Sequence, residues 1–116
     1  MPTTKVNGID LYFEEHGEGN PLLLVPGLGG TGSYWAPQIK TFSRNFRVIV
    51  HDHRGTGISA HDTSISYSVE QMAADLIGLM DALEIEKAHL LGHSTGGAIG
   101  QVISIEHPNR LMSAVL

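Results

Sequence analysis

Residues 92–97 read Gly-His-Ser-Thr-Gly-Gly, and they separate a short apolar run from a longer segment of helical pattern. The run before them, 88–91, predicts a buried strand, and the segment after them predicts a helix from about 95 to 107, ending before Pro108. Small residues on either side of Ser94 let strand and helix approach each other closely. We therefore predict a sharp turn that lifts Ser94 above the edge of a sheet, with a helix N-terminus facing its side chain.

The remaining pattern alternates strands and helices. Continuous apolar runs at 22–25, 46–50 and 111–116 are typical of strands covered on both faces, and strands at 5–7 and 9–15 meet at the hairpin signal Asn7-Gly8. Ser68 with Gln71 forms a capping pattern before an apolar helical stripe, and a weaker helix spans about 36–43 with Pro37 in its first turn. We predict one α/β domain over 1–116, a three-layer fold whose mostly parallel sheet has about six strands and three helices.

Composition excludes several classes of function. The chain has 116 residues, a formal net charge of −5 from 12 acidic and 7 basic residues, and no cysteine. Without a basic cluster, we expect no nucleic-acid or membrane partner, and without cysteine there is no disulfide or thiolate metal site. No run is long enough for a signal peptide or a membrane span, so we expect a cytoplasmic protein that acts on a small molecule, with no cofactor and no metal.

Three motifs together resemble the α/β-hydrolase family. Residues 26–30 (Pro-Gly-Leu-Gly-Gly) are similar to the family's loop after its third strand. Residues 52–59 (Asp-His-Arg-Gly-Thr-Gly-Ile-Ser) resemble its turn after the fourth strand, and the turn at Ser94 resembles its nucleophile elbow after the fifth. One departure is Pro26, which stands where many members have histidine. Locally, residues 27–38 are most similar to aminoacrylate hydrolases and then to enol-lactone hydrolases.

The resemblance implies a role for each matching residue. Ser94 would be the nucleophile of a serine hydrolase acting on an ester, lactone or amide-like bond, and the backbone N–H groups of Leu28 and Thr95 would form the oxyanion hole. Structural roles at the site would belong to Gly27, Gly92, Gly96, Asp52 and Arg54. The family's acid and histidine follow later strands, so we expect this chain to be the amino-terminal half of the fold, without its triad acid and base.

The histidines of this half offer other bases, none of which the sequence assigns. His51 and His53 lie two residues apart at a strand end on the same rim as Ser94, so His53 is a candidate base. Together with Asp52 they are also a candidate metal site, although no further ligands accompany them. His93 is expected to pack against neighbouring strands. Asp52 and Arg54 are expected to organise their turn without direct chemistry.

Two alternatives to a hydrolase remain. Residues 27–32 also match the glycine pattern of a dinucleotide-binding loop, with Asp52 at the expected distance, but Pro37 would then fall inside a helix, where it is unfavourable. The second alternative is a non-catalytic fragment or interaction module. In that case the strand at 111–116 would lie at an exposed sheet edge and self-associate, pair with another polypeptide or aggregate.

Overall fold

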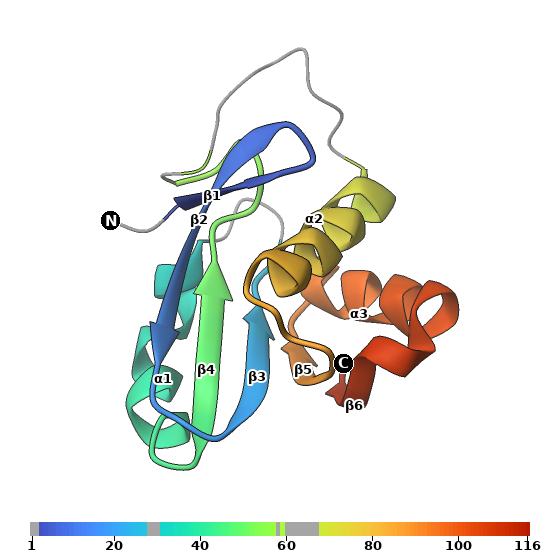
Figure 1. Ribbon diagram of the computed structural model, residues 1–116. Helices are drawn as coiled ribbons and strands as arrows, with labels where there is room; N and C mark the ends of the chain where they lie inside the picture. The colour runs from blue at the N-terminus through green and yellow to red at the C-terminus, as the bar shows by residue number, and fades with distance from the viewer. Residues whose placement is uncertain (1–2, 28–30, 58, 60–67) are drawn as a thin grey trace.

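The computed structural model describes residues 3–27, 31–57, 59 and 68–116. Within these ranges six strands form one sheet in the order β1-β2-β4-β3-β5-β6 (Figure 1). The strands are β1 (Thr3–Val6), β2 (Ile9–His16), β3 (Asn20–Val25), β4 (Phe46–His51), β5 (Ala88–Gly92) and β6 (Leu111–Val115). The α-helices are α1 (Ala36–Phe42), α2 (Val69–Ala82) and α3 (Thr95–Glu106), and the 3₁₀ turns are η1 (Gly32–Trp35) and η2 (Pro108–Arg110).

The sheet is mostly parallel, as the alternating pattern predicts. The pairs β3–β4, β3–β5 and β5–β6 are parallel, whereas β1–β2 and β2–β4 are antiparallel. Each helix lies in a connection between two strands of the parallel part. As a result, the carboxyl ends of β3, β4 and β5 meet at one edge of the sheet, the edge at which α/β folds usually bind ligands.

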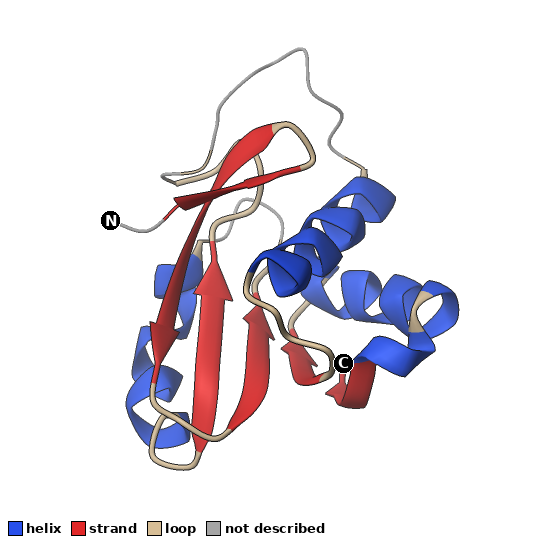
Figure 2. Ribbon diagram, in the orientation of Figure 1, coloured by secondary structure: helices blue, strands red, loops and turns tan. Residues whose placement is uncertain are grey.

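The helices cover the two faces of the sheet unequally (Figure 2). On one face, α2 and α3 pack over Leu23, Val25 and Ile49, and on the other face α1 packs against side chains that include Leu22 and Val48. Alternate residues of β3 therefore enter different cores, which explains why residues 22–25 are all apolar. This arrangement confirms the predicted three-layer α/β fold.

Local signals account for the hairpin and for the start of α2. Asn7 and Gly8 have φ values of 48° and 83°, as a tight two-residue hairpin requires. The Ser68 hydroxyl accepts the Gln71 N–H at 3.0 Å and so caps α2. In β2, alternation predicts an exposed Tyr12, but Tyr12 is 6% exposed. Its hydroxyl donates to Glu14 at 2.6 Å, and this bond, with burial, raises the pKa of Tyr12 to about 12.

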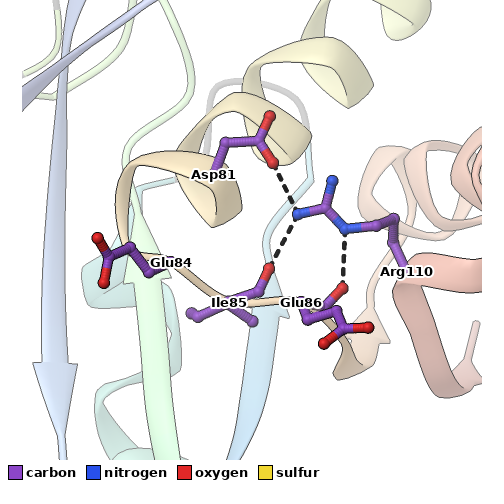
Figure 3. Close-up of a pocket in the computed structure, with 5 residues that line it drawn as sticks. All are labelled: Asp81, Glu84, Ile85, Glu86 and Arg110. Atoms are coloured by element: carbon purple, nitrogen blue, oxygen red, sulfur yellow. Dashed lines mark hydrogen bonds and ion pairs between the residues drawn. The ribbon is translucent and has the colours of Figure 1, made fainter.

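The last strand is less covered than its apolar sequence predicts. Met112 and Val115 are 47% and 63% exposed, because within the described residues β6 is the edge strand and pairs only with β5. Arg110 fixes its start, donating to the Asp81 carboxylate and to the carbonyls of Ile85 and Glu86 (Figure 3). These residues line a pocket of about 390 Å³ between α2 and η2. No helix in the described ranges is long and apolar enough to cross a membrane.

Candidate active site

Ser94 occupies a strained turn between β5 and α3. Its φ of 58° and ψ of −117° lie where residues other than glycine are rarely found. The turn is closed by two backbone hydrogen bonds, from the Gly96 N–H to the His93 carbonyl and from the Gly97 N–H to the Ser94 carbonyl, both 2.9 Å. The Ser94 side chain is exposed and makes no capping bond to its helix. Its hydroxyl is therefore available to an incoming molecule.

Two glycines make this turn possible. A Cβ atom at Gly92 would collide with the carbonyl of Gly96, and one at Gly96 would collide with the carbonyl of Val25. The obstacles are backbone atoms, so no side-chain rotation could relieve them. Strand β5, helix α3 and the end of β3 thus approach as closely as they do only because both positions lack side chains.

Helix α3 begins at Thr95, directly after Ser94. A first-turn N–H has no partner inside its own helix, and among the described residues none accepts a hydrogen bond from Thr95. The helix dipole adds partial positive charge at the same point. A group that develops negative charge beside Ser94 would meet a donor of favourable polarity there.

The end of β3 forms the opposite side of the turn. Gly27 lies against Ser94: a Cβ built on Gly27 would stand 3.4 Å from Cβ and 3.8 Å from Oγ of that serine. Leu28, the other predicted oxyanion donor, lies outside the described residues, so its placement stays a prediction. The backbone leading to it nevertheless runs beside the Ser94 hydroxyl.

Asp52, at the end of β4, is tied to the loop that follows β3. Its Oδ1 accepts the Gly32 N–H at 2.8 Å, and its backbone carbonyl accepts the Ser59 hydroxyl at 2.6 Å. The side chain of Asp52 is buried, and a Cβ at Gly57 (φ 51°) would collide with its carboxylate. The turn is thus folded tightly around this one carboxylate.

Arg54 connects the same turn to α2. Its guanidinium forms two hydrogen bonds with Asp75, Nε to Oδ2 at 2.5 Å and Nη2 to Oδ1 at 2.8 Å, and both side chains are 3% exposed. Asp75 also accepts Nδ2 of Asn7 at 3.0 Å and Nε2 of Gln71 at 3.2 Å. Sequence reasoning did not find Asp75. The signal was present: a charged residue on the apolar stripe of α2 must find a buried partner.

The two histidines at this turn are buried. His51 is 2% and His53 1% exposed, and their rings meet edge to face at 4.9 Å. Burial lowers the pKa of both, that of His51 to about 3. Nε2 of His53 lies 2.9 Å from the Pro26 carbonyl. Nε2 of His53 is therefore bonded to the Pro26 carbonyl, and among the described residues no hydrogen bond joins the His53 ring to the Ser94 hydroxyl.

The prediction for His93 is wrong. Its side chain is exposed and stacks on the ring of Tyr34, at a centroid distance of 5.4 Å and an interplanar angle of 19°. The reason is that β5 ends at Gly92, paired with Val25, so that His93 already belongs to the turn and faces η1 instead of a strand.

Residues 20–116 match the profile of the α/β-hydrolase fold family. The chain belongs to this family. The match leaves the dinucleotide interpretation without support, and α1 starts at Ala36 with Pro37 in its first turn, as the hydrolase interpretation predicts.

Relatives of several named activities share this half of the fold. A protein of Caulobacter sp. strain K31, provisionally named carbamate hydrolase RutD, is 43% identical over 120 residues that cover 100% of this chain and 44% of the relative. The enol-lactonase of Burkholderia xenovorans LB400 is 36% identical with a TM-score of 0.92, covering 97% of this chain and 45% of that one. A mutant of the meta-cleavage product hydrolase CumD from Pseudomonas fluorescens IP01 is 31% identical with a TM-score of 0.94, covering 100% and 44%. The chain thus spans less than half the length of these relatives.

Proposed function

We propose that this chain carries the nucleophile and the oxyanion donors of a serine hydrolase. The observation that carries the proposal is Ser94, exposed in a strained turn at the N-terminus of α3 with its hydroxyl unused by the helix. Strain at a residue whose side chain makes no structural bond is characteristic of functional sites.

In the proposed reaction the Ser94 hydroxyl attacks the carbonyl carbon of the substrate and loses its proton to a base. The carbonyl oxygen becomes an oxyanion, which the N–H groups of Thr95 and Leu28 stabilise. Collapse expels the leaving group and leaves an acyl ester on Ser94, which water then hydrolyses. Preorganised N–H donors of this kind contribute about 10²–10³ in rate each.

The mechanism also needs a base, and among the described residues no candidate base contacts Ser94. The ring of His93 stacks on Tyr34, and that of His53 is bonded to Pro26. A serine hydroxyl without a base is a weak nucleophile, so we expect the 116 residues alone to react slowly. In the family this base is a histidine that follows a later strand, and we propose the same for the whole protein.

The proposed substrates are small molecules with an ester, lactone or carbamate-like carbonyl. Relatives named for carbamate and enol-lactone hydrolysis support this class. Serine at position 94, in place of a carboxylate, favours acyl transfer over attack on an epoxide.

The test is turnover of p-nitrophenyl acetate by the wild-type chain and by Ser94→Ala, followed by mass spectrometry of the acetylated peptide. Ser104→Ala is the matched control, since Ser104 is an exposed serine on the same helix whose hydroxyl donates to the Gly100 carbonyl. We expect acetyl groups on Ser94 and loss of the enzymatic rate in Ser94→Ala alone. Equal rates in all three proteins, with no acetyl on Ser94, would reject the proposal.

A second candidate function, that of an interaction module, is supported by the exposed edge strand β6. Its unpaired backbone groups and apolar side chains favour self-association or pairing with another polypeptide. This function does not require Ser94, so the alanine variant separates the two candidates.

A further inference from the structure

Two consecutive residues of the turn after β4 hold the two ends of the loop after β3. His53 contacts the Pro26 carbonyl at the start of that loop, at 2.9 Å, and Asp52 accepts the Gly32 N–H at its end, at 2.8 Å. All four residues are buried. These bonds fix the backbone at Pro26 and at Gly32 to the turn after β4.

The direction of the His53 bond is determined by chemistry. A carbonyl oxygen can only accept, so Nε2 must carry the hydrogen and donate it. Burial keeps the ring neutral by lowering the pKa of His53, which leaves Nδ1 without a hydrogen. The backbone around His53 is itself fixed, because its carbonyl accepts both the N–H of Thr56 at 2.9 Å and the hydroxyl of Thr56 at 2.7 Å.

The Pro26–Gly27 peptide is therefore held from two sides. His53 bonds its carbonyl oxygen, and α3 approaches the same oxygen closely at Gly96, where a Cβ atom would lie 3.0 Å from it. Gly27, the next residue, lies against Cβ and Oγ of Ser94. Rotation of this peptide would change what the Ser94 hydroxyl faces.

We propose that His53 is a positioning residue: it donates Nε2–H to the Pro26 carbonyl and so holds the Gly27 backbone against Ser94, while Asp52 holds the far end of the same loop. His53 touches neither the substrate nor the reacting atoms. Its effect on turnover rests on the proposed function of Ser94, whereas the hydrogen bond itself does not.

Three variants test the proposal. His53→Phe keeps a buried ring but removes the donor, and His53→Gln replaces the ring with an amide N–H of similar reach. Ile77→Val is the control, because it trims a buried side chain of α2 without touching the His53–Pro26 hydrogen bond. Turnover of p-nitrophenyl acetate gives kcat and KM, and long-range ¹H–¹⁵N correlation spectra report the tautomer of His53 and the ¹⁵N shift of Gly27.

We expect an Nε2–H tautomer in the wild type at pH 8, above the lowered pKa of His53. His53→Phe should shift the Gly27 ¹⁵N resonance and lower kcat about ten- to hundredfold at nearly constant KM, as expected when a catalytic group is misplaced. His53→Gln should restore most of the wild-type Gly27 resonance position and most of kcat. Ile77→Val should change neither the Gly27 resonance nor kcat.

An Nδ1–H tautomer, or an unchanged Gly27 resonance in His53→Phe, would overturn the proposal. The proposal would also be overturned if His53→Gln lost as much kcat as His53→Phe, or if Ile77→Val lost as much. Either result would indicate general destabilisation of the fold. If the wild type shows no turnover dependent on Ser94, the proposed function fails, and the two NMR measurements still decide whether His53 holds the loop.

Discussion

Replacement of Gly96 by alanine tests the packing on which the turn at Ser94 depends. The added Cβ would run into the carbonyl of Val25, with the Pro26 carbonyl oxygen 3.0 Å away. These are backbone atoms of β3 and of the residue that follows it, so α3 as a whole must move away from the sheet. The neighbouring Gly97 is the matched control, because a Cβ there would lie 3.8 Å from its nearest neighbours, an ordinary contact.

The magnitude follows from comparing the two positions. Both lie in the first turn of α3, so both substitutions gain the same helix propensity, about 1 kcal/mol relative to glycine. Only the substitution at position 96 adds the collision, and overpacking of this kind costs about 1–3 kcal/mol. Gly96→Ala should therefore have a lower free energy of unfolding than Gly97→Ala by about 1–3 kcal/mol. Displacement of α3 should also lower Ser94-dependent turnover by up to about a hundredfold.

Urea unfolding followed by circular dichroism measures the first quantity, and p-nitrophenyl acetate hydrolysis the second. Gly97→Ala should be at least as stable as the wild type and retain its rate. If Gly96→Ala is as stable and as active as Gly97→Ala, the close approach of α3 to β3 does not determine the geometry of Ser94, and the reasoning is refuted.

Further outcomes concern charge, pH and the edge strand. Asp75→Asn should lower the free energy of unfolding by about 3–5 kcal/mol, because it removes the buried carboxylate charge that faces the Arg54 guanidinium. Asp81→Asn, at a 63% exposed carboxylate, should cost about 1 kcal/mol or less in the same urea titration. His51 has a folded-state pKa of about 3, so only the unfolded chain gains its proton as pH falls below about 6.5. His51 alone should therefore lower the free energy of unfolding by about 2 kcal/mol from pH 7 to 5. In His51→Phe this contribution to the pH dependence of stability should disappear. The same pH dependence in the wild type and in His51→Phe would contradict the lowered pKa of His51. Val115→Lys on the exposed β6 edge should reduce self-association in light scattering, and a wild type that is monomeric at micromolar concentration would exclude such association.

The strands and helices could be predicted because their signals are local. A strand such as β3, covered on both faces, is apolar at every position of its buried run, and the start of α2 depends on Ser68 and Gln71, three residues apart. The tight turn at Ser94 could be predicted for the same reason, since the glycines it requires lie two residues away on each side.

The contacts around the candidate site could not be predicted because they join distant parts of the chain. Arg54 and Asp75 are 21 residues apart, and His53 and Pro26 are 27 apart. A single sequence shows that a buried charge needs a partner but not which residue supplies it. The exposure of His93 escaped prediction because it depends on β5 ending at Gly92, a boundary that the sequence pattern could not fix to the residue.

The three consecutive residues 52–54 explain how a motif without direct chemistry can determine the geometry of a reactive serine. Each side chain contacts a different part of the fold: Asp52 the start of η1, His53 the residue directly after β3, and Arg54 the middle of α2. Neighbours along an extended chain point in different directions, so one short turn can fix three elements at once. Gly27, two residues after β3, lies against Ser94, and Ser94 itself is bonded to the first turn of α3. Substitutions in 52–54 should therefore alter the surroundings of the hydroxyl and leave the strained backbone of Ser94 unchanged.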